Sequence, residues 1–504
     1  MAKEIEGRIR AANAAIDSDL LRNSEIRNGE FVRYYGKKSE IVIPDTVSTI
    51  SENAFRGNHR LTRLVLGKNV SVIQPNAFRD CVNLKTITLP SGLRIIGENA
   101  FRDCSSLTAA LLPRSTVTVN ASAFHGCSAL RHLSLPNVET LGAYAFCDCT
   151  SLEELVLPES LTAIHRGTFF NCTALQTVRI PTSVCTVGRY SFGFCAALEE
   201  LILPDTITYL GSGAFCNCRS LKHFRVPSLV RFVGDYTFSC CDELESIELP
   251  DGITHFGINA FCACRHLAHI ELPESLKRIG HAAFLNCCSL DEIRIPASVR
   301  EIGTRAFAFC TSLHTAEIHA GINAVEDECF YSCFSLKNIF LPNSVLRIGE
   351  KAFCRCLSLS SVRLSPSLEQ IEERAFCECE NLREISLPST VCRIEGHAFA
   401  DCISLTTALF PNRRISSGYS LFAGCKNLKK LVVPNSHRVF RYQLDRWEVP
   451  TETEIILHGE LLLSLLFTEM AAPETTPERR EELRKEIKKN LAKTGHRRQR
   501  NSKK

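Results

Sequence analysis

Apolar and polar positions follow one pattern that repeats along most of this chain. One copy, residues 85–107, reads KTITLPSGLRIIGENAFRDCSSL, and its apolar positions are Ile87, Leu89, Leu93, Ile96, Ala100, Phe101, Cys104 and Leu107. Ile87 and Leu89 alternate with polar residues at period two, which predicts a short strand. Pro90 has no N–H group and ends that strand. Residues from Leu93 to Gly97 are then expected to cross to the other side of a coil, with Gly97 supplying a backbone conformation that other residues resist.

A phenylalanine marks each copy, and a cysteine usually follows it after three residues. These marker phenylalanines are Phe55, Phe78, Phe101, Phe124, Phe146, Phe169, Phe192, Phe215, Phe238, Phe261, Phe284, Phe307, Phe330, Phe353, Phe376, Phe399 and Phe422. The step is 23 residues except for one step of 22 before Phe146, and sixteen of the seventeen copies have the cysteine. Such strict self-similarity predicts a solenoid in which each repeat packs on its two neighbours.

The chain has 26 cysteines, which in a secreted protein would suggest a disulfide framework. Equivalent residues in successive coils lie about 4.8 Å apart, but their Cα–Cβ bonds run parallel, which does not suit a disulfide. We therefore predict that the phenylalanines and cysteines are a buried packing spine of unpaired thiols. Many free thiols fit a reducing compartment, so the predicted location is cytoplasmic.

The repeat signature is close to LxxIxLPxxLxxIGxxAFxxC over residues 41–434, and IRNGEFVRYYGKKSEIVIPDTV precedes and enters it. In these motifs the chain resembles the BspA-like (treponemal-type) leucine-rich repeat family. The resemblance implies a right-handed, curved horseshoe with a parallel β-sheet on the concave face and a mostly irregular convex side. Relatives of this type include surface adhesins that bind host matrix proteins, which makes an exported adhesin an alternative function.

The ends of a solenoid expose strand edges and need caps. At the amino-terminal end, residues 1–40 are predicted to form a cap. It begins with an amphipathic helix over residues 2–22, because apolar residues there recur at helical spacing. A hairpin with its turn at Asn28 and Gly29 follows, since this pair favours tight two-residue turns.

At the carboxyl-terminal end, residues 435–472 are predicted to form a second cap in which Trp447 seals the last coil. Residues 473–504 form a basic tail, which we expect to be partly helical and then disordered. The whole chain has a net charge of +4, too small to imply a polyanionic partner. The tail is the exception, and a weak electrostatic contact with RNA or other nucleic acid, a membrane or an acidic partner is its alternative to a merely solubilising role.

The predicted partner-binding surface is the concave sheet. Two residues per repeat, eight and ten positions after the marker phenylalanine, should point outward from the strand. We expect a protein or peptide to dock there, with exposed apolar residues as anchors. The candidate residues are Glu200, Ile202, His223, Arg225, Glu248, His269, Glu271, Glu292, Arg294, Glu317 and Phe340.

Two chemical alternatives are weaker. The histidines and carboxylates of this strip suggest a metal or catalytic cluster, but a smooth sheet offers no walls to exclude water. The pairs Cys354/Cys356 and Cys377/Cys379 suggest zinc, but the second cysteine of each pair belongs to the buried spine. The motifs GxxxxGK[ST], GxSxG, HExxH and GxGxxG are absent from the sequence. The sequence thus predicts a non-enzymatic protein-binding scaffold without a cofactor, with a Cys-x-Cys metal protein as an alternative.

Overall fold

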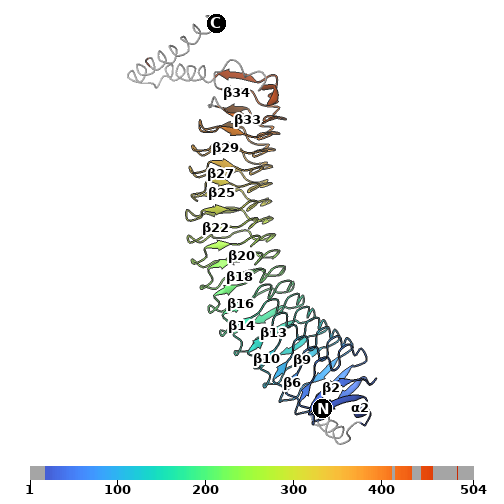
Figure 1. Cartoon of the computed structure of the whole chain (residues 1–504). Helices are drawn as coiled ribbons and strands as arrows, with labels where there is room; N and C mark the ends of the chain where they lie inside the picture. Colours follow the sequence, from blue (N-terminus) through green and yellow to red (C-terminus); the bar gives the residue numbers. More distant parts are fainter. Residues whose placement is uncertain (1–17, 411–414, 434–443, 458–484, 486–504) are drawn as a thin grey trace. The chain divides into compact units, whose positions relative to one another are not determined.

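The protein is a stack of short coils, shown by a computed structural model (Figure 1). It divides into two compact units, Met1–Leu290 and Asp291–Lys504. The residues that the structure describes are 18–410, 415–433, 444–457 and 485. Both units are parallel β-solenoids, as the repeat pattern predicts, while the predicted curvature and handedness stay predictions. None of the helices in this part of the chain is long and apolar enough to cross a membrane.

Most coils contribute a short strand to a main ladder, in the segment that the sequence predicts. Strands pair in parallel with equivalent residues opposite each other, so that His223 faces Ser246 and Arg225 faces Glu248. In the first unit the main-ladder strands are β3 (Glu40–Val42), β5 (Arg63–Val65), β7 (Thr86–Thr88), β9 (Ala109–Leu111), β11 (His132–Ser134), β13 (Glu154–Val156), β15 (Thr177–Arg179), β18 (His223–Arg225) and β20 (Ser246–Glu248). In the second unit they are β23 (Glu292–Ile295), β25 (Thr315–Ile318), β27 (Asn338–Phe340), β30 (Glu384–Ser386), β32 (Thr407–Leu409), β34 (Lys430–Val433) and β35 (Glu454–Leu457).

A second ladder of two-residue strands runs along each unit, on the segment before the marker phenylalanine. The prediction of a mostly irregular side is therefore incomplete. In the first unit these strands are β4 (Thr49–Ile50), β6 (Val72–Ile73), β8 (Ile95–Ile96), β10 (Thr118–Val119), β12 (Thr140–Leu141), β14 (Ala163–Ile164), β16 (Thr186–Val187), β17 (Tyr209–Leu210), β19 (Phe232–Val233), β21 (His255–Phe256) and β22 (Arg278–Ile279). In the second unit they are β24 (Glu301–Ile302), β26 (Ala324–Val325), β28 (Arg347–Ile348), β29 (Gln370–Ile371), β31 (Arg393–Ile394) and β33 (Ser416–Ser417).

The marker phenylalanines form the core of each unit. Phe78 and Phe101 are fully buried, and their rings stack with centroids 5.1 Å apart and planes 4° apart. Phe31 stacks on Phe55 at 5.0 Å, which adds one turn to the seventeen marked by the period. A column of stacked aromatic rings therefore runs through each unit.

The cysteines of the spine are buried donors. Fifteen of the sixteen bond a phenylalanine carbonyl of the preceding coil, as when the Cys81 thiol donates to the Phe55 oxygen at 3.1 Å. Burial raises the pKa of Cys81 to about 12. The predicted buried and unpaired thiols are thus present, and all 26 cysteines are free.

Two residues of each coil adopt a left-handed backbone, two positions before and two positions after the marker phenylalanine. Around Phe101 these are Asn99, with φ of 54°, and Asp103, with φ of 59°. Asn and Asp tolerate this conformation better than most residues. Gly97 is not among the residues with positive φ, so the conformational reason expected for it is wrong. It is needed for close approach instead, because a Cβ atom there would lie 2.6 Å from the carbonyl carbon of Gln74.

The two ends differ in how much of them the structure describes. Helix α2 (Ser18–Arg22) is the described part of the predicted amino-terminal helix. The predicted hairpin is present, with β1 (Ser24–Arg27) antiparallel to β2 (Glu30–Tyr34) and positive φ at Asn28 and Gly29. At the other end Trp447 is buried against Phe410 and Phe422. Apart from residues 444–457 and Lys485, the predicted carboxyl-terminal cap and basic tail lie outside the described residues.

Candidate functional site

The outward positions of the main ladder form the candidate binding surface. Strand β18 shows the predicted alternation, because His223 and Arg225 are exposed while Phe224 between them is buried. Strand β20 repeats it with exposed Ser246 and Glu248. The period-two expectation is therefore confirmed on these strands.

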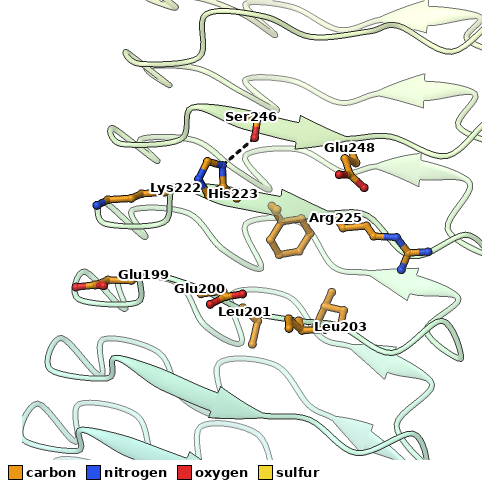
Figure 2. A pocket seen from close by; sticks show the side chains of 11 residues that line it. Glu199, Glu200, Leu201, Leu203, Lys222, His223, Arg225, Ser246 and Glu248 are labelled. Carbon is orange, nitrogen blue, oxygen red and sulfur yellow. Dashed lines mark hydrogen bonds between the residues drawn. The ribbon is translucent and has the colours of Figure 1, made fainter.

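Five of the predicted residues line one hollow of about 440 Å³ on the main ladder of the first unit (Figure 2). These are Glu200, Ile202, His223, Arg225 and Glu248. The sequence did not identify the other lining residues, which are Glu199, Leu201, Leu203, Lys222, Phe224 and Ser246.

The hollow lies where the main ladder is interrupted. Residues 199–203 follow β15 and precede β18, but only Glu200 keeps a bridge to each neighbour, to Thr177 and to His223. The Ile202 side chain in this coil is 74% exposed. This is the highest exposed fraction among the large apolar residues that the structure describes.

The floor of the hollow is apolar. Leu201, Leu203 and Phe224 are at most 3% exposed. Phe224 occupies a strand position that holds a smaller residue in the neighbouring coils, and its ring lies 4.9 Å from that of Phe215 and 4.8 Å from that of Phe238. Because Phe224 is wedged between two rings of the spine, the floor is rigidly supported.

Hydrogen bonds fix the side chains of His223 and Arg225, which also line the hollow. His223 Nδ1 lies 2.9 Å from Ser246 Oγ. The guanidinium of Arg225 donates two hydrogen bonds to the carboxylate of Asp205, from Nη1 to Oδ1 at 3.1 Å and from Nη2 to Oδ2 at 3.4 Å. The hydrogen bond from Arg225, aided by the Ser228 N–H, lowers the pKa of Asp205. Figure 2 shows His223 turned toward Ser246 and Arg225 extended toward the opposite end of its strand.

Charge around the hollow is asymmetric. Glu199, Glu200 and Glu248 carry three negative charges, and Arg225 is already paired with Asp205. Lys222 beside Glu199 is the remaining strong cation in the lining (Figure 2). The hollow therefore combines an apolar floor with an acidic rim.

The other predicted residues lie elsewhere. His269 and Glu271 are exposed, and His269 Nε2 lies 3.8 Å from Glu271 Oε1. In the second unit, Arg294, Glu317 and Phe340 stand opposite one another on consecutive strands. Glu292 is exposed beside them on β23.

Two groups of potential metal ligands converge within the described residues, and neither lies on the predicted strip. They are His125, Cys147 and Asp148, and Cys354, Cys377 and Glu378, with the ligand atoms of each group within 4.8 Å of one another. In the second group, Cys354 and Cys377 are buried rather than outward-facing, and they pack with Ala400. The four thiols of the two Cys-x-Cys pairs do not converge, because Cys356 and Cys379 bond phenylalanine carbonyls in the spine.

Comparison with known proteins defines the class to which this architecture belongs. The fold is that of a leucine-rich repeat solenoid. The family described as "BspA type Leucine rich repeat region (6 copies)" matches residues 24–152, 118–242, 231–360 and 323–444, and the chain belongs to this family. No curated protein matches the chain significantly.

One solved structure shows the same fold, and two others are named with it for their similarity in sequence. A leucine-rich repeat protein from Bacteroides ovatus is similar, with 24% identity over 86% of this chain and 97% of that chain and a TM-score of 0.51. A leucine rich cell surface protein from Faecalibacterium prausnitzii has 20% identity over 86% and 98%, with a TM-score of 0.34. The pneumococcal vaccine antigen PcpA has 19% identity over 86% and 93%, with a TM-score of 0.40.

Proposed function

We propose that this chain is a non-enzymatic, protein-binding scaffold that receives a segment of a partner protein on the main ladder. The anchor of the partner segment is an apolar side chain seated against Ile202 over the floor of Leu201 and Phe224. A lysine or arginine next to that anchor faces the acidic rim of Glu199 and Glu200. The single observation that carries the proposal is the 74% exposure of Ile202 within a hollow whose floor is apolar.

Interface energetics support this assignment. A few apolar anchors in desolvated pockets dominate affinity, while charges at the rim set specificity and association rate. The hollow offers both parts within adjacent coils. We also propose that the scaffold works in a reducing, cytoplasmic compartment, since all 26 of its thiols are free.

The test compares partner capture by the wild-type chain, by Ile202→Asp and by Val156→Asp. Val156 has the same position in its own coil and is 63% exposed, but it does not line the hollow. A partner recovered by wild type and Val156→Asp and lost with Ile202→Asp supports the proposal, and its affinity is then measured with purified proteins. If every captured partner still binds the Ile202→Asp variant, the hollow is not the docking site.

A double variant tests the role of the acidic rim. Reversal of the charge on the rim with Glu199→Lys and Glu200→Lys should weaken the binding of a basic partner at low salt. The loss of affinity should be smaller at high salt. Strengthened binding would mean that the partner is acidic. Detection of the native protein on the outside of intact cells would favour the alternative, an exported surface adhesin.

A further inference from the structure

His125 and Cys147 occupy equivalent positions in successive coils, directly after the marker phenylalanines Phe124 and Phe146. These coils are joined by the one 22-residue step of the repeat. Asp148 follows Cys147 in a left-handed conformation, with φ of 60°. Three different side chains with metal-binding atoms are therefore brought to one point outside the main ladder.

Two of the three distances among these side chains match a tetrahedral ion, and all three ligand atoms lie within 4.8 Å of one another. His125 Nε2 lies 3.4 Å from Asp148 Oδ2, and Cys147 Sγ lies 3.3 Å from the same oxygen. Ligands of a tetrahedral zinc ion at its usual bond lengths lie about 3.3 Å apart for nitrogen and oxygen and about 3.5 Å apart for sulfur and oxygen. The observed spacing thus accommodates an ion with little movement of the chain.

We infer that His125, Cys147 and Asp148 form a binding site for a single Zn²⁺ ion. Imidazole nitrogen, thiolate and carboxylate oxygen are the three ligand types that zinc takes from proteins. The side chains of His125 and Asp148 are 21% and 38% exposed, so an ion can enter from solvent and keep water as a fourth ligand.

The surroundings hold the carboxylate in place. Asn171 Nδ2 donates a 2.7 Å hydrogen bond to Asp148 Oδ1, which leaves Oδ2 directed at His125 and Cys147. Such outer-shell contacts orient the ligands of protein metal sites. Arg102, whose charge acts on both His125 and Cys147, is paired with Asp103 at 3.3 Å.

A nucleophilic cysteine is a poorer account of the same residues. A Cys–His pair needs the imidazole to contact the thiol while its other nitrogen is held by an acceptor. Here both Cys147 and His125 Nε2 contact the same carboxylate oxygen, and His125 Nδ1 is buried without a hydrogen-bond partner among the described residues. Cys147 is also only 4% exposed, which excludes a bulky substrate from its sulfur.

The second ligand group is less suited to a cation. Glu378 Oε2 is engaged by Arg355 at 3.3 Å, and an ion at this point would compete with that guanidinium. Cys354 and Cys377 are instead hydrogen-bonded to each other, which lowers the pKa of Cys377. We therefore assign zinc to the His125 group alone.

The experiment loads the full, reduced chain with Zn²⁺ after treatment with a chelator and removal of the chelator. Calorimetric titration and elemental analysis should find one tightly held zinc per chain. The variants His125→Gln, Cys147→Ser and Asp148→Asn should each raise the Kd at least about tenfold, and Asn171→Ala should raise it less. Co²⁺ should give thiolate-to-metal absorption in wild type and not in Cys147→Ser.

Cys216→Ser is the matched control. Cys216 has the same position in its coil and the same 4% exposure as Cys147, but Gly193 stands in place of His125 and Asn217 in place of Asp148. This variant should bind zinc as wild type does. Absence of stoichiometric zinc, or an equal loss with Cys216→Ser, would overturn the assignment. If Cys147→Ser does not fold, the partly exposed His125→Gln and Asp148→Asn variants decide the question.

Discussion

The thiol of Cys104 donates a hydrogen bond to the carbonyl oxygen of Phe78, 3.2 Å away in the preceding coil. The same oxygen accepts the N–H of Cys81 within its own coil, also at 3.2 Å. The thiol therefore satisfies the second lone pair of a buried carbonyl. The contact recurs along the spine, for example from Cys241 to Phe215 at 3.2 Å.

Replacement of Cys104 by alanine should cost about 1–2 kcal/mol of unfolding free energy. The variant loses the hydrogen bond and leaves a small cavity, and both effects are of order 1 kcal/mol. Urea denaturation of the two proteins measures the difference. Cys185→Ala serves as control, because Cys185 is exposed and its loss should change the midpoint little. Equal stability of Cys104→Ala and wild type would show that the thiol bond contributes nothing.

Stability should fall steeply above about pH 9. Burial raises the pKa of Cys81 to about 12 and raises that of Cys104 well above its ordinary value of 9.0. The unfolded thiols lose their protons near that ordinary value, while the folded thiols keep them. The contribution of each buried thiol to the free energy of unfolding is therefore fully present below pH 9. Above pH 9 it falls by about 1.4 kcal/mol per pH unit, until the pKa of the thiol in the folded protein is reached.

Denaturant melts at pH 8, 9 and 10 measure this slope. A chain with Cys104, Cys127 and Cys172 changed to alanine should be less stable at pH 8 but lose stability more slowly as pH rises. An identical slope would mean that lysine and tyrosine ionisation, rather than the spine, causes the alkaline loss.

Phe238→Ala should cost about 3–5 kcal/mol. The Phe238 ring is fully buried between Phe215 and Phe261, each at a centroid distance of 5.6 Å, so its removal leaves a cavity that rigid neighbours cannot fill. Phe232→Ala removes the same atoms from a ring that is 39% exposed and should cost less than about 1.5 kcal/mol. Urea denaturation of both variants measures the two losses of unfolding free energy. Similar losses would contradict a spine of buried phenylalanines.

The sequence predicts the spine because the period aligns Phe101 with its equivalents and only stacking of identical coils can bury them all. It also predicts that His223 and Arg225 point outward, since period-two alternation continues through their strand. The second ladder was not predicted, because a two-residue strand such as Ile95–Ile96 is too short to show alternation. Its pairing follows from the stacking itself.

The hollow and the proposed zinc site could not be predicted from the sequence, for a different reason. Asp205 holds Arg225 from a turn in the preceding coil, twenty residues earlier, a contact that no local pattern encodes. Regular strand pairing is lost after Glu200, which itself keeps one bridge to each neighbouring coil. His125 and Cys147 are 22 residues apart, and the comparison of equivalent positions in successive repeats is the signal that would have found them.

Gly97→Ala should destabilise the first unit by about 1–3 kcal/mol, the usual range for an overpacked site. The added Cβ would lie 2.6 Å from the Gln74 carbonyl carbon and 2.7 Å from the Pro75 nitrogen, and both are backbone atoms that cannot move aside alone. Gly92→Ala is the matched control, because its nearest neighbour, the Lys68 oxygen, is 3.6 Å from the added atom. Gly92→Ala should be neutral or slightly stabilising through the reduced entropy of the unfolded chain. Thermal melts of the two variants should therefore shift in different directions, and a neutral Gly97→Ala would show that the coils can separate locally at no cost.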